Sequence, residues 1–456
     1  MSESGEGKQV ALGGIPKPRR VLLTVGATLL VGLAALLGFA AALPSAPDPV
    51  TEWNAIAATV TGSLNRGLAR QRALAMVHLA IHDACNAVRP VYASYGGPPP
   101  APAGASVDAA IAAAAHEVLR ATVERPSPTL EVAYYRALLA TPPGEPRRAG
   151  VAVGREAARR ILALRAQDGA DRAATALPAA RAAPGTWEPT PPKHLPALLP
   201  GWTRVAPFVI PRADAFRPPP PPAIGSALYA RQYEEVRQIG AERSPARTPT
   251  QSDTARLWAR DIGEHWNAIA RAAVNSQTET RPPDPLRTWH RARLYALLNL
   301  AMADGFLSGW EAKYHYRFWR PVTAIRQGAR DGNPATAGDP HWSPLLPTPE
   351  HPEYPSTHSV LSGAAAQVLR CTLGTDQARF TVEGGERLAP VVRRYGAFSQ
   401  AAREVVEARI YAGAHFRAAN EEGLRQGERI GAWVCERALP PLRASAPAAN
   451  RGGAGR

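Results

Sequence analysis

Apolar residues recur at the 3.6-residue period of an α-helix along most of this chain, whereas the alternation typical of strands is scarce. Hydrophobic residues make up 45% of the chain and charged residues 20%, which is typical of a globular protein. A chain of 456 residues can bury a large core. The sequence therefore predicts an all-α protein, with helices at about 53–88, 108–122, 130–140, 149–167, 226–240, 249–277, 284–319, 357–373, 387–412 and 418–437.

An internal repeat predicts that the helices form a duplicated bundle. The stretch Trp-Asn-Ala-Ile-Ala occurs twice, at 53–57 and at 266–270. Matching positions continue along both copies, at 75–83 and 296–304 and at two pairs of glycines, Gly150 with Gly154 and Gly423 with Gly427. Chance similarity in an alanine-rich chain is the alternative. We expect two halves that each resemble a four-helix bundle.

Proline marks the predicted boundary between the halves. The segment from Pro178 to Pro222 holds 14 prolines, which favours an extended connector over a packed element. The predicted first half covers 51–170, the Pro-rich connector 171–225 and the second half 226–438. The tail at 439–456 is rich in Pro, Ala, Gly and Arg and is predicted to be disordered.

The N-terminal segment has the layout of an export signal. Basic residues precede an uninterrupted apolar run at 21–43, and small residues such as Ala40 and Ala42 come before Pro44. The pair Arg19-Arg20 resembles a twin-arginine signal, which exports folded proteins. We therefore expect residues 1–46 to direct export to the periplasm or the medium. The alternative is a membrane anchor at 21–43, because 23 apolar residues can span a bilayer.

The charge of the chain favours anionic ligands. The formal net charge is +15, and nucleic acid is the first anionic partner to consider. However, the arginines are scattered along the helices, and no zinc-finger, RNP-like or basic-zipper pattern occurs. We expect no nucleic-acid binding. The three cysteines, Cys85, Cys371 and Cys435, are interpreted as buried thiols, with one disulfide as the alternative in an exported protein.

One helix of the first half carries histidines at a metal-like spacing, at His78 and His82 beside Asp83. The matching positions of the second copy hold Asn299, Ala303 and Asp304. Two histidines without a third clear ligand rarely make a metal site. We therefore expect a packing role for this cluster.

The second half carries cations and a hydroxyl at telling positions. Lys313 and Arg320 are seven residues apart on one helix face, and Pro321 ends or kinks that helix. Ser356 stands where a helix N-cap belongs, and a helix N-terminus offers free amides and a positive dipole to an anion. The loop that precedes this serine carries His351.

A third motif pairs a cation with a histidine. Arg409 and His415 are six residues apart, which would place them on opposite sides of a continuous helix. Gly413 lies between them and can break the helix, so that both side chains can reach one place.

Taken together, these motifs resemble the signature of the type-2 phosphatidic acid phosphatase superfamily. That signature runs Lys, six residues, Arg-Pro; then Pro-Ser-Gly-His; then Ser-Arg, five residues, His, three residues, Asp. This chain departs from it at Thr357 in place of glycine, at Ala408 in place of serine and at Ala419 in place of aspartate. Asn420 is our candidate replacement for the lost acid.

The resemblance implies a tetrahedral oxyanion, phosphate or vanadate, in a pocket of cations and amides. His415 would be the covalent ligand, and His358 would exchange protons with the apical group. The implied oxyanion-binding residues are Lys313, Arg320, Ser356, Thr357, Arg409 and His415.

Over about 380 residues the chain resembles the bacterial vanadium haloperoxidase branch of the superfamily, including 187–191, Trp202 and Trp310. In that branch the positions of Trp310 and His351 line the halide pocket, and histidine at the second position is common in bromoperoxidases. The resemblance also makes Asp261 the expected hydrogen-bond partner of His358.

The implied activity is that of a vanadium haloperoxidase with vanadate as cofactor. Peroxide would bind the vanadate, His358 would take up a proton and Lys313 would polarise the bound peroxide. Halide, with bromide favoured, would then be oxidised to hypohalous acid, which halogenates a small organic acceptor. Two alternatives are an exported acid phosphatase without vanadate, forming a phosphohistidine at His415, and a pseudo-enzyme that only binds oxyanions. A homodimer is left open.

Overall fold

The computed structural model describes residues 48–64, 67–125, 127–174, 183–280, 284–386 and 389–442. The expected signal or anchor at 1–46 and residues 443–456 of the expected tail lie outside these ranges. Within them, no helix has the length and apolar character needed to cross a membrane.

Five α-helices form the first half, and polar N-caps fix several of their starts. Asp48 accepts hydrogen bonds from the amides of Val50 and Thr51 at the start of α2, and Ser106 and Ser127 cap α4 and α5. The helices are α2 (Pro49–Val60), α3 (Gly67–Val88), α4 (Val107–Thr122), α5 (Pro128–Ala140) and α6 (Glu145–Arg165). The single helix predicted at 53–88 is thus two helices, which the 3-10 turn η2 (Thr61–Ser63) separates.

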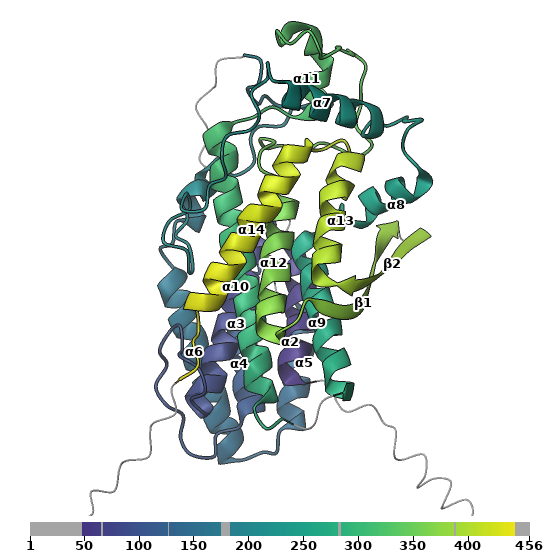
Figure 1. Cartoon of the computed structure of the whole chain (residues 1–456). Helices are drawn as coiled ribbons and strands as arrows, with labels where there is room; N and C mark the ends of the chain where they lie inside the picture. Colours follow the sequence, from purple (N-terminus) through teal and green to yellow (C-terminus); the bar gives the residue numbers. More distant parts are fainter. Residues whose placement is uncertain are drawn as a thin grey trace, which may run out of the picture. The chain divides into compact units, whose positions relative to one another are not determined.

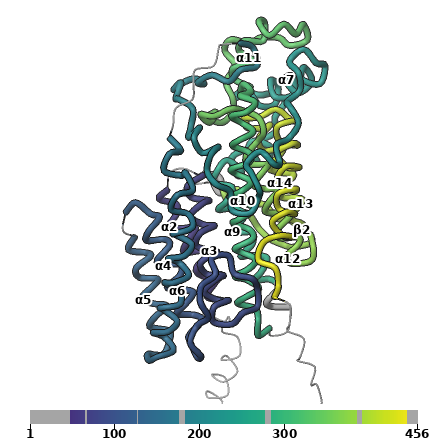
Figure 2. Tube along the Cα trace, turned by 90° about the vertical axis from the view of Figure 1, so that its left-hand side faces the viewer, coloured from purple at the N-terminus to yellow at the C-terminus, as the bar shows by residue number. Residues whose placement is uncertain are grey.

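The second half holds eight α-helices among the described residues. They are α7 (Ala227–Ile239), α8 (Pro249–Leu257), α9 (Ile262–Thr280), α10 (Arg287–Tyr316), α11 (Pro321–Arg326), α12 (Thr357–Leu373), α13 (Phe398–Tyr411) and α14 (Arg417–Arg437). Short 3-10 helices lie in the connections at η3 (Ala170–Arg172), η4 (Pro200–Arg204) and η5 (Gly328–Arg330). Figures 1 and 2 show α7 and α11 at one end of the bundle, where α13 ends and α14 begins. The prediction of an all-α protein is confirmed.

The helix predicted at 387–412 is wrong in its first part. Here β1 (Gln377–Glu386) and β2 (Ala389–Ala397) pair antiparallel, and α13 begins only at Phe398. The buried side chains of Phe380, Val382 and Tyr395 alternate with more exposed ones, and the ring of Phe380 stacks on Tyr395 and Phe398. The helical spacing of apolar residues in α13 continues into this segment, but the segment forms a hairpin because pairing of the two strands buries one of its faces.

Equivalent contacts in both halves confirm the duplicated bundle. The amide of Ser106 donates to the carbonyl of Pro146 at 2.9 Å, and in the second half Ser356 donates to Ala419 at the same distance. The repeated glycines make the matching close approaches between α4 and α6 and between α12 and α14. A Cβ atom at Gly154 or Gly427 would lie 2.2 or 1.9 Å from a facing carbonyl oxygen, at Ala110 and Val360 respectively.

The two halves share one core, in which their repeated asparagines meet. Asn54 donates to Asn267 at 2.7 Å, and Asn267 and Asn299 donate to each other at 3.0 Å. In the first half His78 takes the position of Asn299, and its Nε2 atom lies 3.0 Å from the amide nitrogen of Asn54.

The repeated aspartates hold loops. Asp83 accepts the amides of Tyr95 and Gly96, and Asp304 accepts three loop amides at 208–210. No group of three or more His, Cys, Asp or Glu side chains able to hold a metal ion occurs among the described residues. In the cluster at 78–83, His78 contacts Asn54 and Asp83 holds the loop at 95–96.

The interpretation of all three cysteines as thiols is wrong. Cys371 and Cys435 form a disulfide that joins α12 to α14, and Cys85 is a buried thiol. The two helices run side by side from neighbouring N-termini, which brings these cysteines near their far ends into register.

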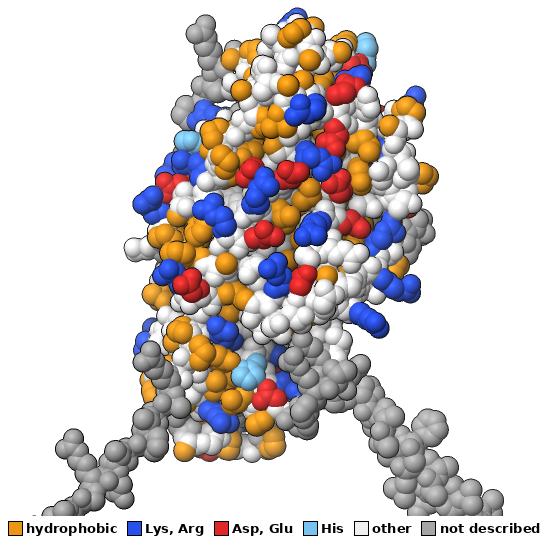
Figure 3. Space-filling model, in the orientation of Figure 1, with side chains coloured by type: hydrophobic (Ala, Val, Ile, Leu, Met, Phe, Trp, Pro, Cys, Tyr) orange, Lys and Arg blue, Asp and Glu red, His pale blue; other side chains and the backbone are white. Residues whose placement is uncertain are grey.

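Surface charge is mixed on the face that Figure 3 presents, where Lys and Arg side chains are interspersed with Asp and Glu. Ion pairs account for several of them, such as Arg417 with Glu235 and Glu407, and Arg425 with Glu422. On this face the excess of positive charge does not gather into one stripe.

Candidate oxyanion site

Five segments of the second half bring the predicted oxyanion residues together at the end of the bundle near α11. They are the last turn of α10, the start of α11, the start of α12, the last turn of α13 and the loop before α14. Although three of the residues are cationic, the six side chains are all buried: Lys313, Arg320, Ser356, Thr357, Arg409 and His415.

Local backbone features aim these residues. Arg317 adopts a positive φ of 48° and ends α10 four residues after Lys313. Arg320 is the N-cap of α11, with Pro321 in the first turn. The prediction that Lys313 and Arg320 share one helix face is therefore wrong, because α10 ends at Tyr316 before it reaches Arg320. Gly413 adopts a φ of 71°, and a Cβ atom there would lie 2.4 Å from the carbonyl oxygen of Gly240. The chain therefore turns sharply between Arg409 and the loop before α14.

Lys313 is fixed by backbone carbonyls. Its Nζ atom donates to the carbonyl oxygens of Pro352, Glu353 and Pro355. These contacts tie the end of α10 to the loop that leads into α12. Burial lowers the pKa of Lys313 well below its usual value, and the charge of Arg320 adds to this effect.

Arg320 bridges two histidines. Its Nε atom donates to the carbonyl of His351 at 2.9 Å and its Nη1 atom to the carbonyl of Ala414 at 2.8 Å. The guanidinium also contacts Nε2 of His415 at 3.2 Å and Nδ1 of His351 at 3.0 Å. A guanidinium can only donate. Nε2 of His415 is therefore an unprotonated acceptor, whereas Nδ1 of His351 also lies 3.2 Å from the carbonyl oxygen of Pro352.

Several buried donors of the site have no acceptor among the described residues. The guanidinium of Arg409 makes no hydrogen bond or ion pair with any described residue, and its Nε atom is buried without a partner. His358 Nε2 and Thr357 Oγ1 are likewise buried and unpartnered. Within the described ranges, Glu353 is the carboxylate that hydrogen-bonds to this cluster. Buried donors without acceptors are costly, so the donor set fits a bound oxyanion such as vanadate or phosphate.

The start of α12 adds free amides to this cluster. Ser356 is the N-cap residue, and its side chain makes no capping hydrogen bond. The first amides of the helix and its dipole therefore remain available to an anion. Thr357 is the first residue of α12 and is not among the residues with positive φ. The side chain at the signature's glycine position thus costs no left-handed backbone.

The two expected halide-pocket residues are in contact. The ring centroids of Trp310 and His351 lie 4.7 Å apart, and the indole of Trp310 donates to the carbonyl of Leu199 at 3.0 Å. Burial lowers the pKa of His351 well below its usual value, and Arg320 and Lys313 add to this effect. His351 is therefore a neutral ring over the tryptophan.

The expected hydrogen bond between Asp261 and His358 is not formed. Asp261 instead accepts the amide of Glu264 at the start of α9, and its other oxygen lies 3.3 Å from Arg70. Because Asp261 caps the start of α9, its carboxylate points along its own helix and does not reach His358. In the same segment, the charge of His265 contributes to the lowered pKa of His358, after burial, Arg409 and Lys313.

Glu353 is the site residue that sequence reasoning missed. Its Oε1 atom accepts from Nδ1 of His415 at 3.0 Å and from the amide of Phe416 at 2.9 Å. Asn420, the expected replacement for the lost acid, instead donates to the carbonyl of Phe416 and accepts from Ser359. The sequence feature that could have indicated Glu353 is its position between Pro352 and Pro355, three residues before Ser356.

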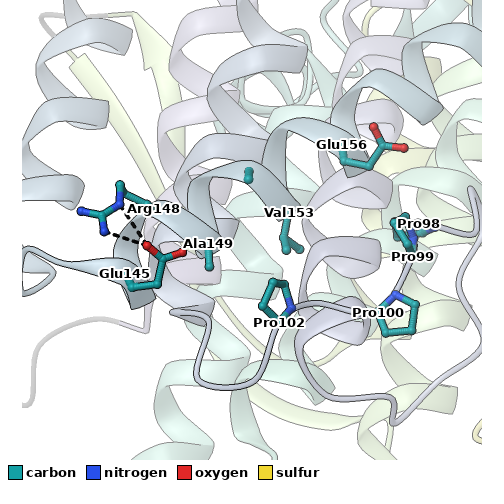
Figure 4. Close-up of a pocket in the computed structure, with 10 residues that line it drawn as sticks. Pro98, Pro99, Pro100, Pro102, Glu145, Arg148, Ala149, Val153 and Glu156 are labelled. Carbon is teal, nitrogen blue, oxygen red and sulfur yellow. Dashed lines mark hydrogen bonds and ion pairs between the residues drawn. The ribbon is translucent and has the colours of Figure 1, made fainter.

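The first half lacks such a cluster at the equivalent place. The first turns of α6 border a surface pocket of about 480 Å³ that prolines at 98–102 also line (Figure 4). Arg148 at its rim pairs with Glu145 through hydrogen bonds of 2.7 and 3.1 Å. None of the described residues that line this pocket has a buried polar side-chain atom without a partner, whereas Thr357, His358 and Arg409 do in the second half.

Comparisons with known proteins agree with this fold. The family described as the VCPO second helical-bundle domain matches residues 293–443. The vanadium chloroperoxidase of Curvularia inaequalis is 28% identical over 394 residues, which cover 70% of this chain. The match spans 63% of the length of that relative.

Solved structures extend the similarity to most of the chain. The first bacterial vanadium-dependent iodoperoxidase has a TM-score of 0.73 at 25% identity, covering 88% of this chain and 99% of its own. An apo bacterial vanadium-dependent chloroperoxidase has a TM-score of 0.65 at 18% identity, covering 80% and 92%, and shares the fold. The chain thus has the helical-bundle fold of these structures. Its similarity to a vanadium chloroperoxidase and to a vanadium-dependent iodoperoxidase supports the resemblance to the vanadium haloperoxidase branch of the type-2 phosphatidic acid phosphatase superfamily.

Proposed function

We propose that this chain is a vanadium-dependent haloperoxidase that uses hydrogen peroxide to oxidise halide to hypohalous acid, which then halogenates a small organic acceptor. The observation that carries the proposal is the buried guanidinium of Arg409, which has no acceptor among the described residues, beside the buried cations Lys313 and Arg320. Such a site is completed by an anion with several oxygens.

The residues of the site divide the work of holding vanadate. Lys313, Arg320 and Arg409 would neutralise the charge of its oxygens, and the amides at the start of α12 with Ser356 would donate to them. The unprotonated Nε2 of His415 would be the ligand to vanadium. When bound, vanadate would supply Lewis-acid activation of peroxide without a redox change at the metal.

His358 is the proposed acid–base residue. It stands in the first turn of α12, and its Nε2 atom has no partner among the described residues. Burial and the charges of Arg409 and Lys313 lower its pKa, so the imidazole is neutral and can accept a proton from peroxide.

Bromide is the halide we propose as favoured. The support is His351, a polar ring that contacts Trp310 at the expected halide pocket. The names of the similar proteins do not decide this choice, because one is an iodoperoxidase and the others are chloroperoxidases.

An acid phosphatase is the second candidate. The same donor set fits phosphate, and a histidine with an unprotonated Nε2 and an Nδ1 held by a carboxylate is suited to nucleophilic attack on phosphorus. This route needs no vanadate.

The deciding experiment is halogenation of monochlorodimedone by peroxide with iodide, bromide or chloride, before and after loading with vanadate. Release of p-nitrophenol from its phosphate ester by the vanadate-free protein tests the second candidate. We expect vanadate-dependent bromination. A chain that retains vanadate but halogenates nothing would contradict the haloperoxidase proposal, and a chain with neither activity would be an oxyanion-binding pseudo-enzyme.

We also propose that residues 1–46 direct export. The support from the described residues is the disulfide between Cys371 and Cys435, because disulfides persist in oxidising compartments. Cell fractionation and N-terminal sequencing of the full chain test this proposal, with Arg19→Lys/Arg20→Lys as the variant that should block a twin-arginine route. Export of that variant at the normal level would exclude the route.

A further inference from the structure

The superfamily signature places an aspartate four residues after the ligand histidine, where this chain has Ala419. We propose that Glu353 replaces that aspartate from a different segment, as the positioning residue that sets the tautomer and the ring orientation of His415. The inference rests on the proposed function and deepens it, because it assigns the residue that prepares the vanadium ligand.

Two independent contacts define the tautomer of His415. On one side Arg320, which can only donate, contacts Nε2 at 3.2 Å, so this nitrogen is the acceptor. On the other side the carboxylate of Glu353 lies 3.0 Å from Nδ1, so this nitrogen carries the proton. Both contacts require the same neutral tautomer. They leave the lone pair of Nε2 on the side of the ring that faces the cations.

Glu353 is itself held rigidly. Its side chain is 1% exposed, and its Oε1 atom also accepts the amide of Phe416, the residue next to His415. Its own amide donates to the carbonyl of Phe318 at 2.9 Å, and its carbonyl accepts from Lys313 at 3.0 Å. The residue therefore connects the loop before α12 to the loop before α14 and fixes two oxyanion residues at once.

No other acid or amide in the described part of the site is placed for this role. Asn420 is engaged with Phe416 and Ser359, and Asp261 caps α9 and pairs with Arg70. A metal-binding histidine commonly donates its second ring nitrogen to a carboxylate, and loss of such a partner typically costs 10- to 100-fold in metal affinity.

The rival role for Glu353 is simple balance of the charges of Lys313 and Arg320. The two roles predict opposite changes in vanadate affinity when Glu353 is replaced by glutamine. If Glu353 only balances charge, then Glu353→Gln removes a negative charge near the anion and should tighten oxyanion binding. If Glu353 positions His415, then the same substitution loosens the ligand and should weaken vanadate binding.

The experiment measures the vanadate dissociation constant of the full chain by equilibrium dialysis. The variants are Glu353→Gln, His415→Ala and the double variant, with Glu350→Gln as the control acid in the same loop. We expect Glu353→Gln to weaken vanadate binding about 10- to 100-fold and to have no further weakening effect in the His415→Ala background. Glu350→Gln should bind like the wild type. Circular dichroism confirms that each variant is folded.

A second measurement reports the tautomer directly. In protein labelled with ¹⁵N-histidine, and with His415→Ala used for assignment, the wild type should show His415 protonated at Nδ1, and Glu353→Gln should show a mixture of tautomers. Recovery of affinity in Glu353→Ala/Ala419→Asp would support the replacement. Equal or tighter vanadate binding by Glu353→Gln would overturn the inference. Absence of vanadate binding by the wild type would instead overturn the proposed function.

Discussion

Arg409 should destabilise the vanadate-free protein and yet be required for oxyanion binding. Its guanidinium is buried and has no hydrogen bond or ion pair among the described residues. Arg165 is just as buried, but it pairs with Asp168 and donates to the carbonyls of Ala206 and Pro207. The two residues allow a matched comparison of an unsatisfied and a satisfied buried arginine.

The magnitude follows from burial. Burial lowers the pKa of Arg409 from its usual value to about 10, and a difference of this size corresponds to roughly 3 kcal/mol. A buried donor without a partner costs about 1–3 kcal/mol. Arg409→Met keeps much of the volume without the charge. It should therefore raise the free energy of unfolding of the vanadate-free protein by about 1–3 kcal/mol.

Arg165→Met should act in the opposite direction. Asp168 keeps its pairing with Arg72 at 2.7 Å, but the hydrogen bonds to two backbone carbonyls are lost. We expect a loss of about 1–3 kcal/mol. Vanadate binding should remain near normal, because Arg165 lies outside the oxyanion site.

The assay is thermal unfolding in buffer free of phosphate and vanadate, and then with vanadate added. Vanadate at about 100 times its dissociation constant should stabilise the wild type by roughly 2.7 kcal/mol and should leave Arg409→Met unchanged. If Arg409→Met is less stable than the wild type without vanadate, Arg409 does not destabilise the vanadate-free protein. If vanadate stabilises both proteins equally, Arg409 is not required for oxyanion binding.

Four further predictions concern histidines. His415→Ala should abolish vanadate retention while circular dichroism shows unchanged helix content. His358→Ala should retain vanadate but lose about 10²- to 10⁴-fold in halogenation rate, and loss of vanadate instead would exchange the two roles. His351→Phe should raise chloride oxidation relative to bromide in the monochlorodimedone assay, whereas an unchanged ratio would remove His351 from the halide site. Burial lowers the pKa of His78 to about 3, so only the unfolded chain takes up a proton at this residue between pH 6.5 and 3. The free energy of unfolding should therefore fall by about 1.4 kcal/mol for each pH unit of acidification in this range. His78→Asn should reduce this pH dependence, as measured by denaturant titrations at several pH values.

The sequence predicted elements and motifs whose signals are local. The glycine between Arg409 and His415 and the serine before α12 each act through their own backbone, and each is found at the turn or cap expected of it. The proline after Arg320, by contrast, begins α11 and does not end the helix that carries Lys313. The hairpin at 377–397 was missed because its short apolar runs continue into the helical pattern of α13, and period alone does not separate strand from helix in such runs.

Side-chain partners between segments were not predictable in the same way. Asp261 and Glu353 are both acids near predicted site residues, and the sequence favours neither as a hydrogen-bond partner. The choice depends on the path of the loop before α12, which carries Glu353 to Nδ1 of His415, and on the capping position of Asp261 at α9. The first depends on packing between elements distant in sequence, whereas the second is a local contact that holds Asp261 on its own helix.

The repeated glycines of α14 set how closely this helix packs against α12, which carries part of the candidate site. Gly423, Gly427 and Gly431 lie four residues apart on α14, and at each a Cβ atom would lie within 2.7 Å of a carbonyl oxygen of α12 or of its N-cap residue. Cys435 continues this spacing and forms the disulfide to Cys371.

This close parallel packing sets the two N-termini side by side, so that the amides at the start of α12 meet the loop that carries His415. The first half has the same packing through Gly150 and Gly154, and Ser106 stands where the second half has Ser356. At the rim of its pocket, however, the cation Arg148 is already paired with Glu145. The duplicated packing therefore supplies the frame in both halves, whereas an anion is required only where buried donors converge without acceptors. A close helix pair alone is thus insufficient for oxyanion binding, and the unpartnered donors of the second half are the feature that distinguishes the site.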